Sequence, residues 1–531
     1  MEYRGPWDDI DVPDVSLYDL LFEHLSEADG AKVAFDHAET GQVLTFAELK
    51  QQIDSVATWL AERSIGAGDV VAIVLHNRPE YAVAFHGTMR TGAATSPVNP
   101  AASAHEVARQ LRTTAARVVV TSSDELATVR AALDLLDEQV DSLVVVGSPD
   151  DDTIDWGELI TTEVDLPEVH LDPATHIACL PVSSGTSGLP KAVMLSHRNL
   201  VANMMQFDVA LDSMGEDNSM LSFLPFSHIY ALTTNMNYSL LRRFCQYTMS
   251  TFQPGLFAKL VTTRRPTLLF VVPPVASLLV RSHAMRELDW SSVRLVVSGA
   301  APLDGAVGQA VQEMMGTRLV QGYGMTELSP VTHVIPVDRC DIPLDTIGQA
   351  IPNLRFRVVD PVTGADVAPA APGGWSEPGE LWCQGPNTML GYLGHPEATA
   401  EVLVEDGWVR TGDLVVVDEH GTTKVVDRIK ELIKRRGYQI PPAELEALLV
   451  THPQVADAAV LGRDRGDGDE VPHALLVLAE GVDPLTAPDH ILHWANEQMA
   501  AYKRIASSTV VAQLPRSAAG KILRRRLDAL V

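Results

Sequence analysis

The residues best suited to chemistry form a short run at positions 183–191, with the sequence SSGTSGLPK. Glycines let a backbone approach a ligand closely and adopt positive φ at low cost. Hydroxyl groups, free backbone N–H groups and one cation together suit a polyphosphate. We therefore predict a loop that binds a nucleoside triphosphate through Ser183, Ser184, Gly185, Thr186, Ser187, Gly188 and Lys191.

The same run could instead be a P-loop or a polar surface loop. A P-loop needs the pattern G-x-x-x-x-G-K-[ST], but here Lys191 follows Pro190, and Ala192 stands where the magnesium-binding hydroxyl would be. A polar surface loop is the commoner origin of a bare Gly/Ser/Thr run. However, the apolar runs 177–182 and 193–195 flank this one, and they predict buried strands that enter and leave a glycine-rich turn.

A second cluster of suitable residues is the run QGYGMTE at 321–327, which follows the strand-like residues 318–320. Glycines at a strand end expose backbone at the edge where open α/β sheets bind ligands. A tyrosine ring can stack on a purine. Thr326 can donate to a phosphate oxygen, and Glu327 can bind Mg²⁺, which prefers oxygen ligands. In isolation the same run would more often be a turn with a surface glutamate.

Three later motifs also contain charged groups. In the run WVRTGDL at 408–414, a tight turn could hold the Asp413 carboxylate ready to accept two ribose hydroxyls, or the carboxylate could simply cap that turn. The basic run 426–439 would usually be a solvated face. Lys521 follows Ser-Ala-Ala-Gly near the C-terminus, where a lysine is normally mobile. Because the three motifs occur together in one chain, a functional origin is favoured over a separate structural origin for each.

Composition limits the class of protein. A chain of 531 residues is too long for one hydrophobic core, and 46% hydrophobic and 21% charged residues are typical of a globular protein. With 40 basic and 69 acidic residues the net charge is −29, which argues against a nucleic-acid-binding surface. A local basic pocket for a nucleotide remains compatible with that charge.

Several features favour a cytoplasmic protein without a transmembrane segment. The N-terminal residues are acidic and lack the apolar stretch of a signal peptide. The most apolar run, 267–280, is too short to span a bilayer and contains two prolines, so we expect a core strand followed by a turn. The four cysteines show no CxxC or zinc spacing, which indicates buried reduced thiols.

Strand-like runs alternate with amphipathic segments along most of the chain, which predicts βαβ units and mostly parallel sheets. The expected strands include residues 70–75, 117–121, 142–146, 268–272 and 294–297, and a helix is expected at 81–91. The predicted class is therefore α/β, with a large N-terminal domain at 1–426 that includes a small β-rich subdomain at about 354–426. A small mobile α+β domain is expected at 427–531.

In this order and at these separations, the five motifs resemble the motif series of the adenylate-forming superfamily, which includes acyl-CoA synthetases, luciferases and adenylation domains of peptide synthetases. The resemblance extends from residues 45–46 to Lys521. The runs 224–232, 298–303 and 441–446 are similar to the 4-coumarate–CoA ligase-like branch. The resemblance implies that a carboxylate attacks the α-phosphate of ATP to give acyl-AMP and pyrophosphate, and that a thiol then displaces AMP.

The resemblance also implies the role of each motif. Lys521 would bridge the carboxylate and the α-phosphate, Thr326 would contact the α-phosphate, and Glu327 would hold Mg²⁺. Asp413, aided by Arg428, would bind the ribose. The phosphate loop would hold the β- and γ-phosphates, and Gly299, Ala300 and Ala301 would line the adenine slot with Tyr323. Gln321, Gly322 and Gly324 are counted among the nucleotide-binding residues.

The pocket for the acid follows from the same motif matches. It would consist of His228, Tyr230, Thr234, Val296, Gly299, Gly324, Pro330 and Val331. His228 could be a core histidine, but its segment resembles the family's gating aromatic, so we count it among the catalytic candidates. Polar groups select hydroxylated ligands, and Val296 is apolar. We therefore expect a fatty acid or an unsubstituted, cinnamate-like aryl acid.

The second half-reaction depends on the C-terminal domain. The resemblance implies that this domain rotates after adenylation about a hinge at Asp427 or Lys430. The rotation would bring Lys434, counted as a catalytic candidate, with Arg435, Arg436 and Gly437 to the thiol of CoA. Two alternatives stay open: a ligase that loads the phosphopantetheine of a carrier protein, and a non-catalytic nucleotide-binding protein on the same fold.

Overall fold

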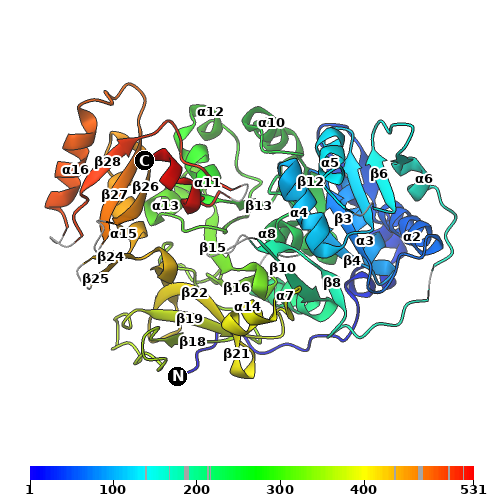
Figure 1. Cartoon of the computed structure of the whole chain (residues 1–531), viewed down its shortest axis with the longest axis horizontal. Helices are drawn as coiled ribbons and strands as arrows, with labels where there is room; N and C mark the ends of the chain where they lie inside the picture. The colour runs from blue at the N-terminus through cyan, green and yellow to red at the C-terminus, as the bar shows by residue number, and fades with distance from the viewer. Residues whose placement is uncertain are drawn as a thin grey trace.

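The computed structural model describes residues 1–137, 140–166, 168–183, 190–211, 215, 217–435, 438–464, 470–499, 503–517 and 520–531. Among the described residues, two nine-stranded sheets form the larger part of the molecule, and three smaller sheets lie mainly in the C-terminal third of the chain (Figure 1). The predicted α/β fold class is confirmed. Within the described residues, no helix is both long enough and apolar enough to cross a membrane.

The first large sheet has the strand order β17-β16-β15-β14-β13-β11-β12-β1-β2. Its central strands are parallel, and antiparallel pairs occur at both edges. Continuously apolar strands such as β13 suit a parallel sheet whose two faces are both covered. The strands are β1 (Val33–His37), β2 (Val43–Thr45), β11 (Ser219–Ser222), β12 (Cys245–Thr248), β13 (Leu268–Val271), β14 (Leu295–Ser298), β15 (Arg318–Gly324), β16 (Val331–Val334) and β17 (Gln349–Ala350).

The second large sheet has the order β20-β10-β8-β4-β3-β5-β6-β7, and β9 pairs with β10. The strand β10, which follows the predicted phosphate loop, pairs antiparallel with β8, β9 and β20. The strands are β3 (Val70–Val74), β4 (Ala94–Pro97), β5 (Val118–Ser122), β6 (Ser142–Val146), β7 (Ile154–Asp155), β8 (Ile177–Cys179), β9 (Val182–Ser183), β10 (Lys191–Ser196) and β20 (Gly391–Tyr392).

Helices pack around both large sheets, and local signals define where several of them begin. Capping boxes start α2, α4 and α7 at Thr45, Ser103 and Ser196, where a side chain accepts from an otherwise unpaired N–H. The helices are α1 (Glu27–Gly30), α2 (Phe46–Glu62), α3 (Pro79–Arg90), α4 (Ala104–Thr114), α5 (Leu126–Leu133), α6 (Trp156–Ile160), α7 (His197–Ala210), α8 (Ile229–Ala231), α9 (Tyr238–Arg242), α10 (Pro254–Arg264), α11 (Pro273–Arg281), α12 (His283–Arg286) and α13 (Gly305–Met315), with the π-helical turns η1 (Asp19–Glu23) and η3 (Leu232–Asn237) and the 3₁₀ turn η4 (Thr326–Leu328).

A third sheet is antiparallel and lies below the first sheet in Figure 1. It contains β18 (Arg355–Val359), β19 (Gly379–Gln384), β21 (Leu403–Val404), β22 (Trp408–Val417) and β23 (Thr423–Arg428), accompanied by α14 (Pro396–Val402) and the 3₁₀ turn η5 (Glu405–Gly407). The tight turn expected around Asp413 is wrong, because this residue lies inside the long strand β22. A glycine with φ of 71° precedes it, and the ladder with β23 shifts register just after it.

The last hundred residues form cores of their own. Apolar side chains from residue 433 onward pack in two separate clusters, although the boundary at 426/427 itself stays a prediction. The elements are the 3₁₀ turn η6 (Ile429–Glu431), β24 (Ile433–Arg435), β25 (Tyr438–Ile440), α15 (Pro442–Val450), β26 (Val455–Asp464), β27 (Glu470–Leu478), α16 (Ala487–Glu497), β28 (Ser507–Val510), η7 (Arg524–Arg526) and η8 (Asp528–Leu530). These elements lie beside α11 and α13 (Figure 1).

The side chain of Asp427 connects the end of β23 to this C-terminal part. Its Oδ2 accepts from the backbone N–H of Ala443 at 3.0 Å. Ala443 is the second residue of α15, which begins with Pro442. Since proline has no N–H, Asp427 satisfies the first N–H that this helix end offers. Burial raises the pKa of Asp427 to about 6.

Two local predictions differ from the structure because of proline. The single strand expected at 177–182 is divided into β8 and β9, because Pro181 between them has no N–H to donate. The turn expected after β13 is wrong, since Pro273 starts helix α11, where a first-turn proline loses no helical hydrogen bond. The cysteines are free as expected, but Cys340 is exposed rather than buried.

Candidate active site

The ends of β14 and β15 bring two of the predicted motifs together. Ser298 and Gln321 are register partners, so Gly299 follows its strand beside the run 321–327. The Gln321 side chain accepts from the N–H of Leu303 at 3.1 Å and donates to the carbonyls of Leu344 and Thr346. Its amide therefore holds the loop after β14 in place, and a contact of Gln321 with a nucleotide stays a prediction.

Gly324 has a structural reason to be glycine. A Cβ built on it would lie 1.9 Å from the carbonyl oxygen of Pro330 and 3.0 Å from Cα of Val331. Since real Cβ atoms do not approach so closely, any side chain would push β16 away from β15. The structure therefore brings together three of the residues predicted for the acid pocket, by contact of their backbones.

A buried carboxylate joins three strands. The Tyr323 hydroxyl, on β15, donates to Oδ2 of Asp413 on β22, and Nε of Arg428 on β23 lies 3.1 Å from Oδ1. Burial and the Asp413 charge raise the pKa of Tyr323, so the phenol stays protonated and donates. A carboxylate has about four lone-pair sites, so Asp413 can still accept ribose hydroxyls while both neighbours hold it.

A second carboxylate is held in the same way by a residue that the sequence analysis missed. The Tyr392 hydroxyl donates to Oε1 of Glu327 at 2.7 Å, and the ammonium of Lys191 lies 5.3 Å from the Tyr392 ring centroid. Tyr392 reaches this position because β20 pairs with β10, opposite Val193. The sequence Gly391-Tyr392 does not by itself predict a functional tyrosine, because the contact depends on the pairing of β20 with β10.

The charge of Lys521 interacts with both of these carboxylates. Burial, with a smaller contribution from Arg428, lowers the pKa of Lys521 to about 8, and the charges of Asp413 and Glu327 oppose the shift. Burial, together with the Lys521 charge, lowers the pKa of His228 to about 4, so this ring is neutral near pH 7. The Lys521 amine is therefore within electrostatic reach of Asp413, of Glu327 and of His228.

His228 and Tyr230 line a small cavity with apolar partners, namely Leu224, Pro225, Ala231 and Val272. The N–H of Tyr230 donates to Nδ1 of His228 at 3.2 Å, which leaves the ring proton on Nε2. A Cβ on Gly299 would lie 2.9 Å from Cζ of Tyr230, so the tyrosine ring packs directly on this glycine. Thr234 donates to the carbonyl of Tyr230 at 2.8 Å. Val296 is fully buried within β14 and does not line this cavity.

The remaining predicted residues divide into two sets. Residues 184–189 of the phosphate loop, with Arg436 and Gly437, lie outside the described residues. Lys434 and Arg435 belong to β24, where the N–H of Lys434 donates to Glu470 at 2.8 Å and Arg435 donates to the carbonyl of Arg504 at 2.7 Å. These contacts are all within the C-terminal part, so a role at the thiol stays a prediction.

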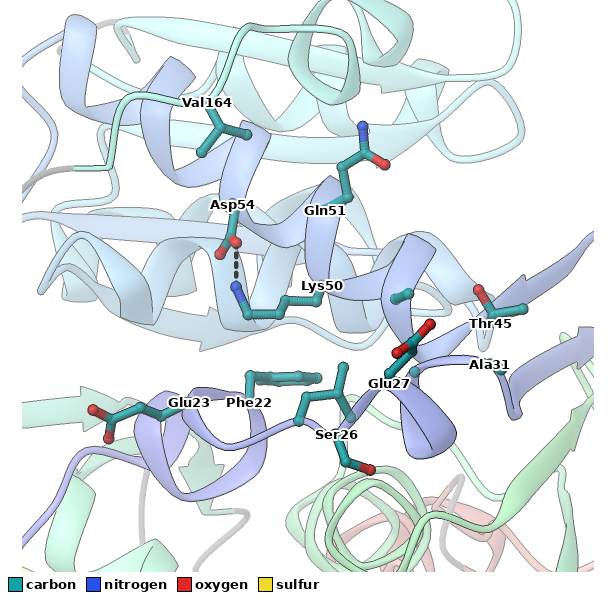
Figure 2. A pocket seen from close by; sticks show the side chains of 13 residues that line it. Phe22, Glu23, Ser26, Glu27, Ala31, Thr45, Lys50, Gln51, Asp54 and Val164 are labelled. Carbon is teal, nitrogen blue, oxygen red and sulfur yellow. Dashed lines mark hydrogen bonds and ion pairs between the residues drawn. The ribbon is translucent and has the colours of Figure 1, made fainter.

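A larger hollow of about 610 Å³ lies elsewhere, between η1, α1 and α2. Figure 2 shows its side chains, including the ion pair between Lys50 and Asp54 at 2.6 Å. None of the predicted site residues lines it. Over the described ranges, no group of three or more histidine, cysteine, aspartate or glutamate side chains could hold a metal ion. One carboxylate, Glu327, suits Mg²⁺ bound chiefly by phosphates and water.

Comparison with known proteins shows the family to which this chain is similar. A family model described as AMP-binding enzyme matches residues 22–393, and a model of the AMP-binding enzyme C-terminal domain matches residues 444–521. The chain is 34% identical to a probable 4-coumarate–CoA ligase 1 of Dictyostelium discoideum, covering 99% of this chain and 97% of the relative. For 4-coumarate–CoA ligase 3 of Oryza sativa subsp. japonica the identity is 35%, with 99% and 94% covered. The crystal structure of ATP-bound MatB from Rhodopseudomonas palustris superposes with a TM-score of 0.85 at 26% identity, over 97% of this chain and 98% of that one.

The lowered pKa of Lys521 predicts how activity depends on pH. If adenylation needs the ammonium form, kcat/KM for ATP should be constant at neutral pH and fall as the pH rises through about 8, the pKa of Lys521, because this parameter reports the free enzyme. Acid-dependent pyrophosphate release measured between pH 6.5 and 10 checks this. A profile that stays flat to pH 9.5 would contradict it.

Tyr392→Phe should loosen Glu327 while keeping the ring next to Lys191. Loss of an orienting hydrogen bond to a metal-binding side chain typically costs about 10-fold or more in metal affinity or activity. We expect the Mg²⁺ concentration for half-maximal adenylation to rise about 10-fold, with little change in KM for the acid. Tyr247→Phe, on β12, is the matched control, and equal Mg²⁺ dependence in both variants would refute the orienting role.

Proposed function

This chain belongs to the AMP-binding enzyme family and is an AMP-forming acid–CoA ligase, and we propose that the acid it activates is apolar. The candidates are a fatty acid and an unsubstituted, cinnamate-like aryl acid. The cavity beside His228 has a volume of only about 10 Å³ and so represents one point of such a site, and its mostly apolar lining supports this proposal; the other lining residues are Leu224, Pro225, Tyr230, Ala231 and Val272. Val296 supports it less directly, because it is apolar but buried away from that cavity.

The observation that supports the proposed chemistry best is the position of Lys521. Its charge interacts with Asp413 and Glu327, which are proposed for the nucleotide, and with His228, which lines the small cavity. Attack of a carboxylate on the α-phosphate gathers negative charge between the two reactants. A cation fixed at that point stabilises this charge without reorganisation during the reaction.

The other residues would position the two substrates. Asp413 would accept the ribose hydroxyls while Tyr323 and Arg428 hold it, and Gly299, Ala300 and Ala301 would line the adenine slot. The phosphate loop would bind the β- and γ-phosphates, with Thr326 at the α-phosphate. Glu327, oriented by Tyr392, would hold Mg²⁺, which neutralises phosphate charge when bound.

CoA is proposed as the acceptor in the second half-reaction. The C-terminal domain would turn at Asp427 or Lys430, withdrawing Lys521 and presenting Lys434, Arg435 and the two residues after them. Their positive charge suits the phosphates of CoA. Loading of a carrier-protein phosphopantetheine is the alternative outcome of the acceptor test.

Lys521→Ala separates the two half-reactions. Removing one stabilising group from such a site typically costs about 100-fold or more in rate, so acid-dependent release of pyrophosphate should fall by at least that factor. Thioester formation from supplied acyl-AMP and CoA should remain within a few-fold of wild type. Wild-type pyrophosphate release by this variant would show that Lys521 has been misassigned.

A substrate panel tests the proposed acid class. We expect kcat/KM for cinnamate or a medium-chain fatty acid to exceed that for 4-hydroxycinnamate by about 10-fold or more, because an apolar pocket leaves the added hydroxyl unpaired. The assay is CoA-dependent AMP release, repeated with a carrier protein as acceptor. A clear preference for hydroxycinnamates over both apolar acids would reject the proposed class.

A further inference from the structure

The segment that presents Lys521 has little regular structure of its own. Residues 515–517 and 520–523 run side by side as the two arms of a narrow hairpin, in which Arg516 and Ile522 make an isolated bridge. Ser517 donates its N–H to the carbonyl of Lys521 at 2.7 Å, and Leu523 donates to the carbonyl of Pro515 at 2.8 Å. The N–H of Gly520 also donates to the carbonyl of Ser517 at 2.8 Å. A hairpin held by so few backbone contacts is only marginally stable, so other contacts must hold Lys521 in place.

Arg516 fixes the first arm of this hairpin. Its Nη2 lies 2.9 Å from each carboxylate oxygen of Asp457, on β26. Its Nη1 donates to the carbonyl of Gly520 at 2.8 Å. One planar guanidinium therefore ties β26 to the residue that immediately precedes Lys521. Arginine suits this role because its donors form a rigid fork.

Arg524 fixes the second arm, three residues after Lys521. Its two terminal nitrogens donate to the two carboxylate oxygens of Glu446, on α15, at 2.9 and 3.1 Å. Nη1 also donates to the carbonyl of Val460 at 2.8 Å, and Nε pairs with Glu431 in η6. The second arm is thus tied to α15, to β26 and to the turn that follows β23.

The tip of the hairpin fits tightly against the N-terminal part. Gly520 has φ of 79°, and a Cβ on it would lie 3.1 Å from Cγ and Cδ of Pro274 and 3.5 Å from Val272. Val272 also lines the cavity beside His228. The hairpin therefore reaches the edge of the proposed acid pocket with almost no free space, and a shift of about 1 Å in a catalytic group can cost about 100-fold in rate.

We propose that Arg516 and Arg524 are positioning residues for adenylation, which clamp the two hairpin arms, 515–517 and 520–523, and so fix where the Lys521 amine meets the reacting centre. The inference rests on the proposed role of Lys521. Neither arginine is assigned a contact with ATP or the acid. Since Lys521 serves only the first half-reaction, loss of the clamp should affect that half-reaction alone.

The simplest alternative is that the two arginines only stabilise the C-terminal fold. Buried or half-buried ion pairs often contribute little net stability, but removal of one partner leaves the other uncompensated. Loss of fold stability would lower both half-reactions together. The two explanations therefore differ in the ratio of adenylation to thioester formation.

The experiment uses full-length Arg516→Met and Arg524→Met, which keep the aliphatic stem and remove the fork. Arg463→Met, an exposed arginine on β26, is the matched control, and Lys521→Ala is the reference. We expect each clamp variant to release pyrophosphate about 10- to 100-fold more slowly. Thioester formation from supplied acyl-AMP should stay within two-fold of wild type and of the control. Arg516→Lys should recover only part of the loss, since a single ammonium lacks the two separate nitrogens that bind Asp457 and the Gly520 carbonyl at once.

A second measurement reports on Lys521 itself. A loosened hairpin lets the amine reach water, so the alkaline limb of the adenylation profile should move upward from the pKa of about 8 that burial gives Lys521. A purely structural role would lower the rate without moving this limb.

Four results would overturn part of the account. Wild-type pyrophosphate release in both clamp variants, with Lys521→Ala strongly impaired, rejects the clamp alone. If the rates of both half-reactions fall equally, the arginines serve stability only. The same conclusion holds if adenylation slows but the alkaline limb of its pH profile does not move. Wild-type adenylation in Lys521→Ala rejects the proposed role of Lys521, whatever the arginine variants show.

Discussion

The proposed site depends on one electrostatic constraint: an amine of the C-terminal part, that of Lys521, interacts with the charges of two carboxylates that precede this part in the chain. Asp413 and Glu327 favour the charged form of Lys521, whereas burial and Arg428 oppose it. In the free enzyme, burial therefore destabilises the Lys521 cation. An anionic substrate bound beside it would stabilise the cation. Such a group is suited to a negative charge that develops between two reactants.

Two tyrosines prepare the carboxylates for that task. Tyr323 donates to Asp413 and Tyr392 donates to Glu327, and each tyrosine lies on a different large sheet from the other. The two large sheets therefore position the carboxylates directly: a tyrosine on β15 holds Asp413, and a tyrosine on β20 holds Glu327. Groups held in this way need little rearrangement when substrates arrive.

Much of this arrangement was predictable from the sequence, and the exceptions have physical causes. Apolar runs predicted the strands β3, β5, β6, β13 and β14, because a buried parallel strand needs apolar side chains on both faces. Proline caused two local errors, since it can divide a strand or begin a helix as readily as it ends one.

Other parts of the site could not be predicted from local sequence. Tyr392 was missed because only the pairing of β20 with β10 brings it to Glu327. Arg516 and Arg524 look like ordinary surface charges until the fold brings Asp457 and Glu446 to them. Asp413 was predicted to lie in a tight turn, but it lies inside strand β22, directly after a glycine with positive φ.

The most direct test of the central claim is a crystal structure of the chain with its acid and a non-hydrolysable ATP analogue. The account predicts that Nζ of Lys521 lies within hydrogen-bonding distance, about 3 Å, of both the carboxylate and an α-phosphate oxygen, with the hairpin of residues 515–517 and 520–523 against Pro274. A complex in which both ligands occupy the site and Lys521 contacts neither of them would contradict it.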